Sequence, residues 1–334
     1  MYEVTESTTP TAIAKSPYPV KTSEWDLHDI YQLEELTQLI THICNGISMF
    51  GVGCVISVKD FQRKETRLPK AVSIGLFLQT LIQPLTGFLL AMLLQMSKYD
   101  ALAMVVIASA PSAPYASVLS YWGDGNVALS VCIATLSTAL SIGMMPMWFF
   151  LYSSVWSRQH FIVAYPLDIA QYLLLIIVPV GFGMATKWCM PKVSKYIARV
   201  CSIMFLSSVV ICSLLYLIFH TDHFRAGWHL YLSALLLPFI GFFLGFLMAF
   251  VLRLPYEVCI AISLAVGSVN GPLAITVALH SFEGATKVVQ VVLQLPAIYA
   301  LFAPVEGIVW SLMYKMVDEV FSKAHPALCG TGSV

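Results

Sequence analysis

Two clusters of proline, glycine and small polar residues interrupt long apolar stretches of the chain. The first, residues 110–117, has prolines at positions 111 and 114, and the second, residues 267–272, has two glycines and a proline around Asn270. Pro114 cannot donate a hydrogen bond to the carbonyl four residues back, and Pro111 disfavours helical backbone at the residue before it. Each cluster is expected to break a helix, which leaves carbonyls and half-helix ends to bind ions and anions.

The elements that hold these clusters are expected to lie in a membrane. The chain of 334 residues is 58% hydrophobic and only 11% charged, with a mean hydropathy of +0.80, whereas globular proteins carry about a quarter charged residues. A helix needs about 20 apolar residues to cross a bilayer. Nine stretches meet this need, the first less apolar than the others: residues 36–58, 71–97, 101–123, 125–157, 169–186, 200–221, 226–252, 258–282 and 288–305.

Several classes of protein are excluded by charge and by motif. The 18 Lys and Arg residues balance the 18 Asp and Glu residues, so the basic excess that nucleic-acid binding needs is missing. The sequence has no P-loop or metal-ligand spacing. Asp100 and Asp124 fall at opposite faces of the predicted membrane, so they cannot form a catalytic pair. We therefore expect no enzyme, no catalytic residue, no cofactor and no metal beyond a coupling ion.

Orientation follows from the basic residues, which concentrate in the cytoplasmic loops of membrane proteins. With the N-terminus outside, 12 of the 18 Lys and Arg residues fall in inside segments and 6 in outside segments. We expect a multi-pass protein of the plasma membrane, with residues 1–34 as a polar extracellular segment, residues 35–320 as the membrane domain and residues 321–334 as a cytoplasmic tail. Residues 1–30 are polar, so no cleavable signal peptide is expected.

A repeat relates the two interruptions to each other. Residues 81–94 (LIQPLTGFLLAMLL) and residues 235–248 (LLLPFIGFFLGFLM) share a proline, a glycine three residues later and the following Phe. In the predicted topology the two copies cross the membrane in opposite directions, and each precedes a span with an interruption. Inverted repeats with discontinuous helices are the architecture of many secondary transporters, so we predict this class.

Landmark segments over about residues 35–320 carry a specific resemblance. They are GVGC at 51–54, QTLIQPLTGF at 79–88, YWGDGNVALSV at 121–131, ST at 137–138, MMP at 144–146, LP at 254–255, Gly267 with Asn270, and PAIYALF at 296–302. The sequence resembles the bile acid:sodium symporter family, which moves bile acids and sulfated steroids with sodium. The resemblance implies an all-α integral membrane protein of nine transmembrane helices with inverted repeats and two crossing broken helices. It also implies a panel domain of spans 1, 5 and 6 and a core domain of spans 2–4 and 7–9.

The first interruption departs from the family pattern. A serine and an asparagine that give oxygen to one sodium site in the family align with Ala116 and Ser117, and a threonine of that site aligns with Ala134. Ser117, Ser130 and Thr135 are therefore the side chains that the resemblance leaves as ion ligands.

The second interruption departs further. The family's Glu-x-Gly-x-Gln-Asn reads AVGSVN at residues 265–270, so the carboxylate and the glutamine are gone, and Gln79, Gly267 and Asn270 remain as ion-binding candidates. A buried sodium ion needs about five or six oxygen ligands and a negative charge nearby. Because several of these ligands are replaced here, we infer weakened sodium sites. Three explanations remain open. The protein couples transport to one remaining sodium ion, it couples transport to another ion, or it is a facilitative carrier without coupling.

The resemblance implies an amphipathic organic anion as cargo, a bile acid or a sulfated steroid, carried by alternating access between panel and core. The substrate-cleft candidates are Pro111, Ser112, Pro114, Ser268 and Pro272. Glu306, a carboxylate deep in a predicted span, is either a charge compensator or a carboxyl hydrogen-bonded within the core. The alternatives in function are a sodium-independent carrier of another amphipathic solute and a non-transporting, receptor-like protein.

Overall fold

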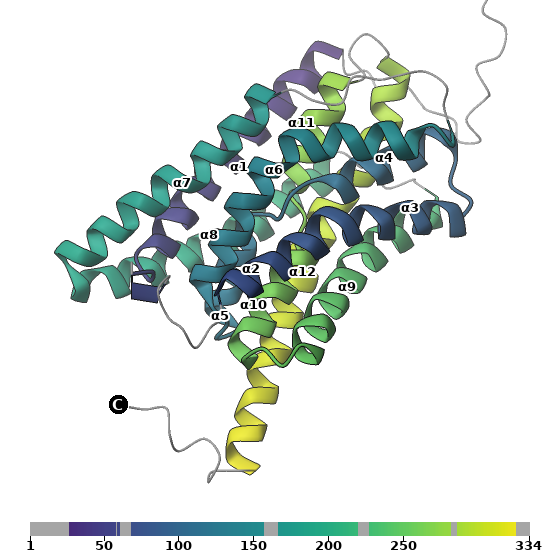
Figure 1. Ribbon diagram of the computed structural model, residues 1–334. Helices are drawn as coiled ribbons and strands as arrows, with labels where there is room; N and C mark the ends of the chain where they lie inside the picture. Colours follow the sequence, from purple (N-terminus) through teal and green to yellow (C-terminus); the bar gives the residue numbers. More distant parts are fainter. Residues whose placement is uncertain are drawn as a thin grey trace, which may run out of the picture. The chain divides into compact units, whose positions relative to one another are not determined.

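The computed structural model (Figure 1) describes residues 27–57, 59–60, 68–156, 166–219, 227–281 and 286–324, and all elements in these ranges are helical. The helices are α1 (Leu27–Gly53), α2 (Leu68–Phe77), the π-helix η2 (Leu78–Ile82), α3 (Gln83–Leu93), α4 (Lys98–Ser109), α5 (Tyr115–Trp122), α6 (Val127–Ser153), α7 (Pro166–Cys189), α8 (Pro191–Phe219), α9 (Trp228–Val251), α10 (Tyr256–Gly267), α11 (Gly271–Ser281) and α12 (Thr286–Ala324). The prediction of an all-α protein is confirmed for the described residues.

The chain divides into two compact units after Leu39. Residues 1–39 contribute the first part of α1 to the described structure. Residues 40–334 contain the rest of α1 and each later helix. The site described below lies in this second unit.

Five helical stretches in the described part of the chain are long and apolar enough to cross a membrane. They are Pro69–Leu93, Val127–Ser153, Ala170–Cys189, Trp228–Val251 and Val291–Val317. Two other apolar regions, α4–α5 and α10–α11, give shorter helices because each is interrupted. The predicted multi-pass membrane protein is confirmed by these helices.

The helices α4 and α10, which end at the two interruptions, are buried in the interior of the protein. Every residue of α4 from Asp100 to Ser109 is buried, and so is every residue of α10 from Val258 to Gly267. A helix that is buried all round must be covered by other helices on each side. The helices that contact α4 include α3, α6, α11 and α12, and those that contact α10 include α5, α6, α9 and α12.

The repeat motifs hold the neighbours of these central helices at very short range. A Cβ atom on Gly87 of α3 would collide with Ala108 of α4, and one on Gly241 of α9 would lie 2.8 Å from the Cα of Gly267 of α10. Each glycine of the repeat therefore packs on the turn just before an interruption. Small residues let helices approach closely in membrane bundles. A side chain at either position would push the two helices apart.

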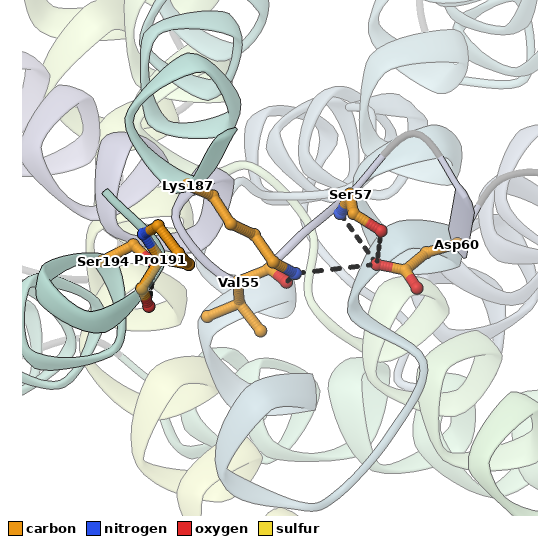
Figure 2. Close-up of polar contacts among 6 residues, drawn as sticks. All are labelled: Val55, Ser57, Asp60, Lys187, Pro191 and Ser194. Atoms are coloured by element: carbon orange, nitrogen blue, oxygen red, sulfur yellow. Dashed lines mark hydrogen bonds and ion pairs between the residues drawn. The ribbon is translucent and has the colours of Figure 1, made fainter. Parts of the chain in front are cut away.

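The ends of the helices are fixed by polar side chains. Ser97 accepts a hydrogen bond from the Asp100 amide at the start of α4, and Asn126 accepts one from the Leu129 amide at the start of α6. Lys187, near the end of α7, donates to the carbonyl of Val55 just after α1 and lies 4.0 Å from the Asp60 carboxylate (Figure 2). These contacts satisfy backbone groups that helix termini leave without partners.

Candidate ion and substrate site

The two interruptions lie against each other in the buried interior. Their backbones meet in an isolated antiparallel bridge. On one side of it the Ala113 amide donates to the Ser268 carbonyl at 2.7 Å, and on the other the Asn270 amide donates to the Pro111 carbonyl at 2.8 Å. The non-helical backbone of each break is thus hydrogen-bonded to the backbone of the other break. Buried amides and carbonyls require such partners.

The other carbonyls at the breaks also have protein donors. Gln79 Nε2 donates to the Ala110 carbonyl at 3.1 Å, and Ser112 Oγ donates to the Ala265 carbonyl at 2.7 Å. The prediction that the breaks leave free carbonyls is therefore too simple. A carbonyl oxygen has two lone pairs, so those that accept one bond keep a second site for a cation.

Tyr299 of α12 joins the two sides of the second interruption, and the sequence did not single it out as a site residue. Its hydroxyl accepts a hydrogen bond from the Val269 amide at 3.0 Å and donates one to the Gly267 carbonyl at 3.0 Å. The side chain is 1% exposed. A tyrosine in an apolar span needs a polar partner for its hydroxyl, and this is the signal that would have identified it.

Of the ion-binding candidates, Ser117 and Ser130 lie together. Their hydroxyl oxygens are 3.4 Å apart, across the contact between α5 and α6, and both side chains are fully buried. Thr135 is half-buried on the same helix as Ser130. Five residues turn a helix by about 500°, so Thr135 points roughly 140° away from Ser130 and does not join the pair.

Gln79 and Asn270 reach the breaks from different directions. Gln79 lies in the π-helix η2, and its Oε1 atom is buried without a partner among the described residues. Asn270 Oδ1 accepts a hydrogen bond from the Leu273 amide at 3.1 Å and so caps α11, while its Nδ2 atom has no partner in that set. Each side-chain amide therefore has one atom in a hydrogen bond that stabilises the protein and one atom, Oε1 of Gln79 or Nδ2 of Asn270, without a partner among the described residues.

The substrate-cleft candidates lie at different places along the two breaks. Ser112 is fully buried, with its amide bonded to Ser137 Oγ at 3.2 Å and its hydroxyl to the Ala265 carbonyl, so it stabilises the break. Pro114 precedes the first residue of α5. Pro111 and Ser268 are buried residues of the first and second breaks, and Pro272 is the half-buried second residue of α11.

Glu306 has no hydrogen bond to explain its place in α12. Both carboxyl oxygens are shielded from solvent, and neither has a partner among the described residues. The interpretation of Glu306 as a carboxyl hydrogen-bonded within the core is therefore not supported by the described contacts.

This arrangement defines a class: a multi-pass, all-α membrane protein whose interrupted helices pair backbone to backbone inside the bundle. The sequence profile of the Sodium Bile acid symporter family matches residues 42–225, more than half of the chain. The chain belongs to this family.

Named relatives match over most of the chain. The human sodium-dependent organic anion transporter is 26% identical over 293 residues, which cover 88% of this chain and 77% of that protein. The human ileal sodium/bile acid cotransporter is 29% identical over 270 residues, with 81% and 77% covered. The rabbit (Oryctolagus cuniculus) ileal cotransporter is 28% identical over 293 residues, with 88% and 82% covered. These relatives are named as transporters and not as enzymes.

Proposed function

We propose that this protein is a secondary carrier of amphipathic organic anions, of the bile acid or sulfated steroid class, that works by alternating access. The observation that carries the proposal is the backbone pairing of two interrupted helices inside a member of this family. Irregular backbone at membrane depth persists only where protein or a wet cavity satisfies it. Carriers bind their cargo and ions at such places.

In this proposal the chain crosses the plasma membrane nine times, with the N-terminus outside and the C-terminus in the cytoplasm. Two ion pairs support this topology. Lys315 lies 3.3 Å from Asp124, and both belong to segments predicted inside. His229, at the end of its span that is predicted to face outside, lies 3.3 Å from Asp100 in a segment predicted outside. Each pair requires its two members to lie at the same face of the membrane, as the proposed order of spans has them, and the excess of Lys and Arg then assigns the cytoplasmic face.

The inverted repeat is supported by a contact between its two copies, α3 and α9, which lie side by side. Gln83 Nε2 donates to the Leu237 carbonyl at 3.3 Å. Each of these residues directly precedes the proline of its copy. Contacts between equivalent positions are expected at a two-fold axis, so the contact fits two halves related by such an axis.

The panel domain in this proposal is α1, α7 and α8, and the core domain is formed by the other helices. Within the panel, a Cβ atom on Gly53 of α1 would collide with the Val180 backbone of α7, and one on Gly51 would collide with Cys201 of α8. Such close backbone packing supports a panel that moves as one body. The cargo would lie between panel and core, next to Pro111, Ser268 and Pro272.

Transport is coupled to a cation, with sodium sites weaker than those of the relatives. Ser117 and Ser130 offer two hydroxyls, and Gln79 and Asn270 offer amides that are partly used in structural bonds. Ala134 and Ala265, where the family pattern has oxygen ligands, are fully buried and offer only methyl groups. Each lost ligand removes oxygen that a hard cation needs.

The test is uptake of a radiolabelled bile acid and of a labelled steroid sulfate by cells that express the protein, with sodium replaced stepwise by choline. The human ileal sodium/bile acid cotransporter is measured beside it. We expect saturable uptake, with half-saturation by sodium at about tenfold or more higher concentration than for the comparison protein, since about 1.4 kcal/mol of lost binding is tenfold. Equal sodium dependence would reject the weakened sites, and no uptake of either anion would reject the carrier.

Two alternative functions give other outcomes of the same experiment. A sodium-independent carrier of another amphipathic solute would give uptake that choline leaves unchanged, or uptake of a different solute. A receptor-like protein would bind a labelled anion without accumulating it. The unfilled ligand positions at Ala134 and Ala265 favour these two alternatives over a fully coupled symporter.

A further inference from the structure

An apolar groove runs along α7 beside the end of α1. Its volume is about 550 Å³, and it is lined by Phe50 of α1, by residues of α7 from Val178 to Cys189, and by Met190. Small-molecule ligands occupy clefts of about 300–1,000 Å³. The groove is therefore large enough to hold one long apolar chain.

The groove faces away from the packed interior. Ile176 and Val180 of α7 are buried in a hydrophobic cluster, whereas Val178 and Phe182 in the groove are exposed, Phe182 to 66%. Residues two apart in a helix point about 200° away from each other, so the groove lies on the side of α7 opposite the buried pair. Because α7 is apolar and long enough to cross a membrane, this side meets lipid.

The length and chemistry of the groove suit an acyl chain. From Val178 to Cys189 the helix rises by roughly 16 Å, at about 1.5 Å per residue. The hydrocarbon of one leaflet is about 15 Å deep, half of a core of about 30 Å. The hydroxyl of Thr186, which also lines the groove, donates to the Phe182 carbonyl at 2.9 Å. An apolar chain would therefore leave this hydroxyl satisfied.

Positive charge follows directly after the groove. Lys192 is two residues beyond Met190, so their Cα atoms lie at most about 7 Å apart. Lys192, Lys195 and Arg199 are exposed, and their spacing of three and four residues places them on one face of α8. Among the ion pairs between described residues, none involves these three side chains. Their charge is therefore available to an anion at the end of the groove.

Two exposed aromatic side chains indicate the depth of this segment in the membrane. Trp188, at the end of α7, is 88% exposed, and Tyr196, in α8, is exposed as well. Trp and Tyr are enriched where a membrane meets water, at the level of the lipid headgroups. Lys192 and Lys195 lie in the same short segment, so their ammonium groups are expected at the level of the lipid phosphates.

We infer that the groove between α1 and α7 binds an anionic phospholipid of the cytoplasmic leaflet, with an acyl chain along α7 and the headgroup at Lys192, Lys195 and Arg199. Basic segments beside a membrane helix attract anionic lipids, which the cytoplasmic leaflet carries, and the groove gives the chain a fixed place. The leaflet follows from the proposed orientation, but the site does not depend on anion transport. A lipid bound here contacts α1, α7 and α8, the helices of the proposed panel.

Thermal unfolding of the purified full-length protein in detergent tests the site. Dioleoyl phosphatidylserine, dioleoyl phosphatidylcholine and the chain-free headgroup glycerophosphoserine are added in separate titrations. We expect phosphatidylserine to raise Tm by about 3 °C or more above phosphatidylcholine, because its net negative charge complements the basic residues. Glycerophosphoserine should leave Tm unchanged, because it cannot fill the groove. Salt at about 1 M should remove most of the difference between the two lipids, since the Debye length falls to about 3 Å.

Two variants with matched controls separate the headgroup from the chain. Lys192→Glu should raise the phosphatidylserine concentration that gives half of the Tm shift about tenfold or more, and Lys70→Glu, an exposed site on α2, should leave it unchanged. Ala185→Trp fills the groove and should abolish the shift. Leu174→Trp puts the same side chain at an exposed position of α7 that does not line the groove, and should keep the shift.

Three results overturn the inference: phosphatidylserine that raises Tm no more than phosphatidylcholine, glycerophosphoserine that acts as well as the whole lipid, or a Lys192 or Ala185 variant with the wild-type response. Failure of the proposed function looks different. A protein that keeps the phosphatidylserine response but accumulates no anion has the lipid site without transport, whereas anion uptake by a protein without that response is transport without the lipid site.

Discussion

Single hydroxyl and amide groups stabilise the interruptions, and they differ in how well sequence identifies them. Gln79 and Asn270 stand out because amides are rare in apolar spans, and both do reach the breaks. A tyrosine hydroxyl in an apolar span marks Tyr299 as a residue that needs some polar partner, but the sequence does not name that partner, because its contacts join positions about 30 residues away. Such partners depend on how α12 packs, and local pattern does not carry that information.

Removing the Tyr299 hydroxyl tests its structural role. Tyr299→Phe leaves the Val269 amide and the Gly267 carbonyl buried without their partner, which we expect to cost about 1–3 kcal/mol and to lower Tm of the purified protein by several degrees. Tyr121→Phe, on a half-buried tyrosine near the end of α5, is the control and should change Tm little. An unchanged Tm for the Tyr299 variant would show that the hydroxyl does not hold the break.

Restoring the missing oxygen ligands tests the argument about weakened sodium sites. The combined change Ala134→Thr, Ala265→Glu and Val269→Gln should lower the sodium concentration that half-saturates uptake. All three positions are fully buried, so overpacking will destabilise the variant by about 1–3 kcal/mol at each site, and uptake must be scaled to the amount of folded protein. Sodium dependence identical before and after the change would refute the argument from lost ligands.

At the scale of elements, prolines and glycines predicted the breaks but not every helix boundary. The two clusters end α4 and α10 as expected. Pro296 and Pro304 do not end α12, which runs 39 residues from Thr286 to Ala324 and past the predicted span at 288–305. A proline removes one hydrogen bond from a helix, and tertiary packing supplies enough contacts to continue it. The π-helix at Leu78–Ile82 has no sequence signal that we recognise.

The packing of α9 on α10 depends on Gly241. A Cβ atom there would lie 2.8 Å from the Cα of Gly267, which is backbone and cannot move aside cheaply. We expect Gly241→Ala to destabilise the protein by about 1–3 kcal/mol. Gly143→Ala is the matched control, since a Cβ atom there meets nothing within 4 Å and alanine stabilises a helix interior by roughly 0.5–1 kcal/mol. Equal thermal stability of the two variants would contradict the close contact.

At the scale of the whole molecule, the charges in the sequence predict the orientation, and the ion pairs at the ends of the helices require only that the two members of each pair share one face of the membrane. Domain motion leaves no such mark on a sequence, because it depends on how two packed surfaces separate. The panel and core assignment accordingly comes from the resemblance and is supported here by the close packing of α1 on α7 and α8.

Orientation can be tested with glycosylation sites, because none of the three asparagines is followed by the Asn-x-Ser/Thr pattern. Glu6→Asn creates the pattern in the N-terminal segment with Ser7 and Thr8, and Cys329→Asn creates it in the C-terminal tail with Thr331. We expect an endoglycosidase-sensitive increase in mass for the first variant in mammalian cells and none for the second. The opposite result would reverse the topology.

The central claim is that this protein carries amphipathic organic anions across a membrane, and counterflow tests it without assuming any coupling ion. Purified protein is reconstituted into liposomes loaded with unlabelled steroid sulfate or bile acid, and a trace of the labelled anion is added outside. The carrier predicts transient accumulation of label that protein-free liposomes do not show. Labelled anion that binds the protein but never accumulates in loaded liposomes would contradict the claim.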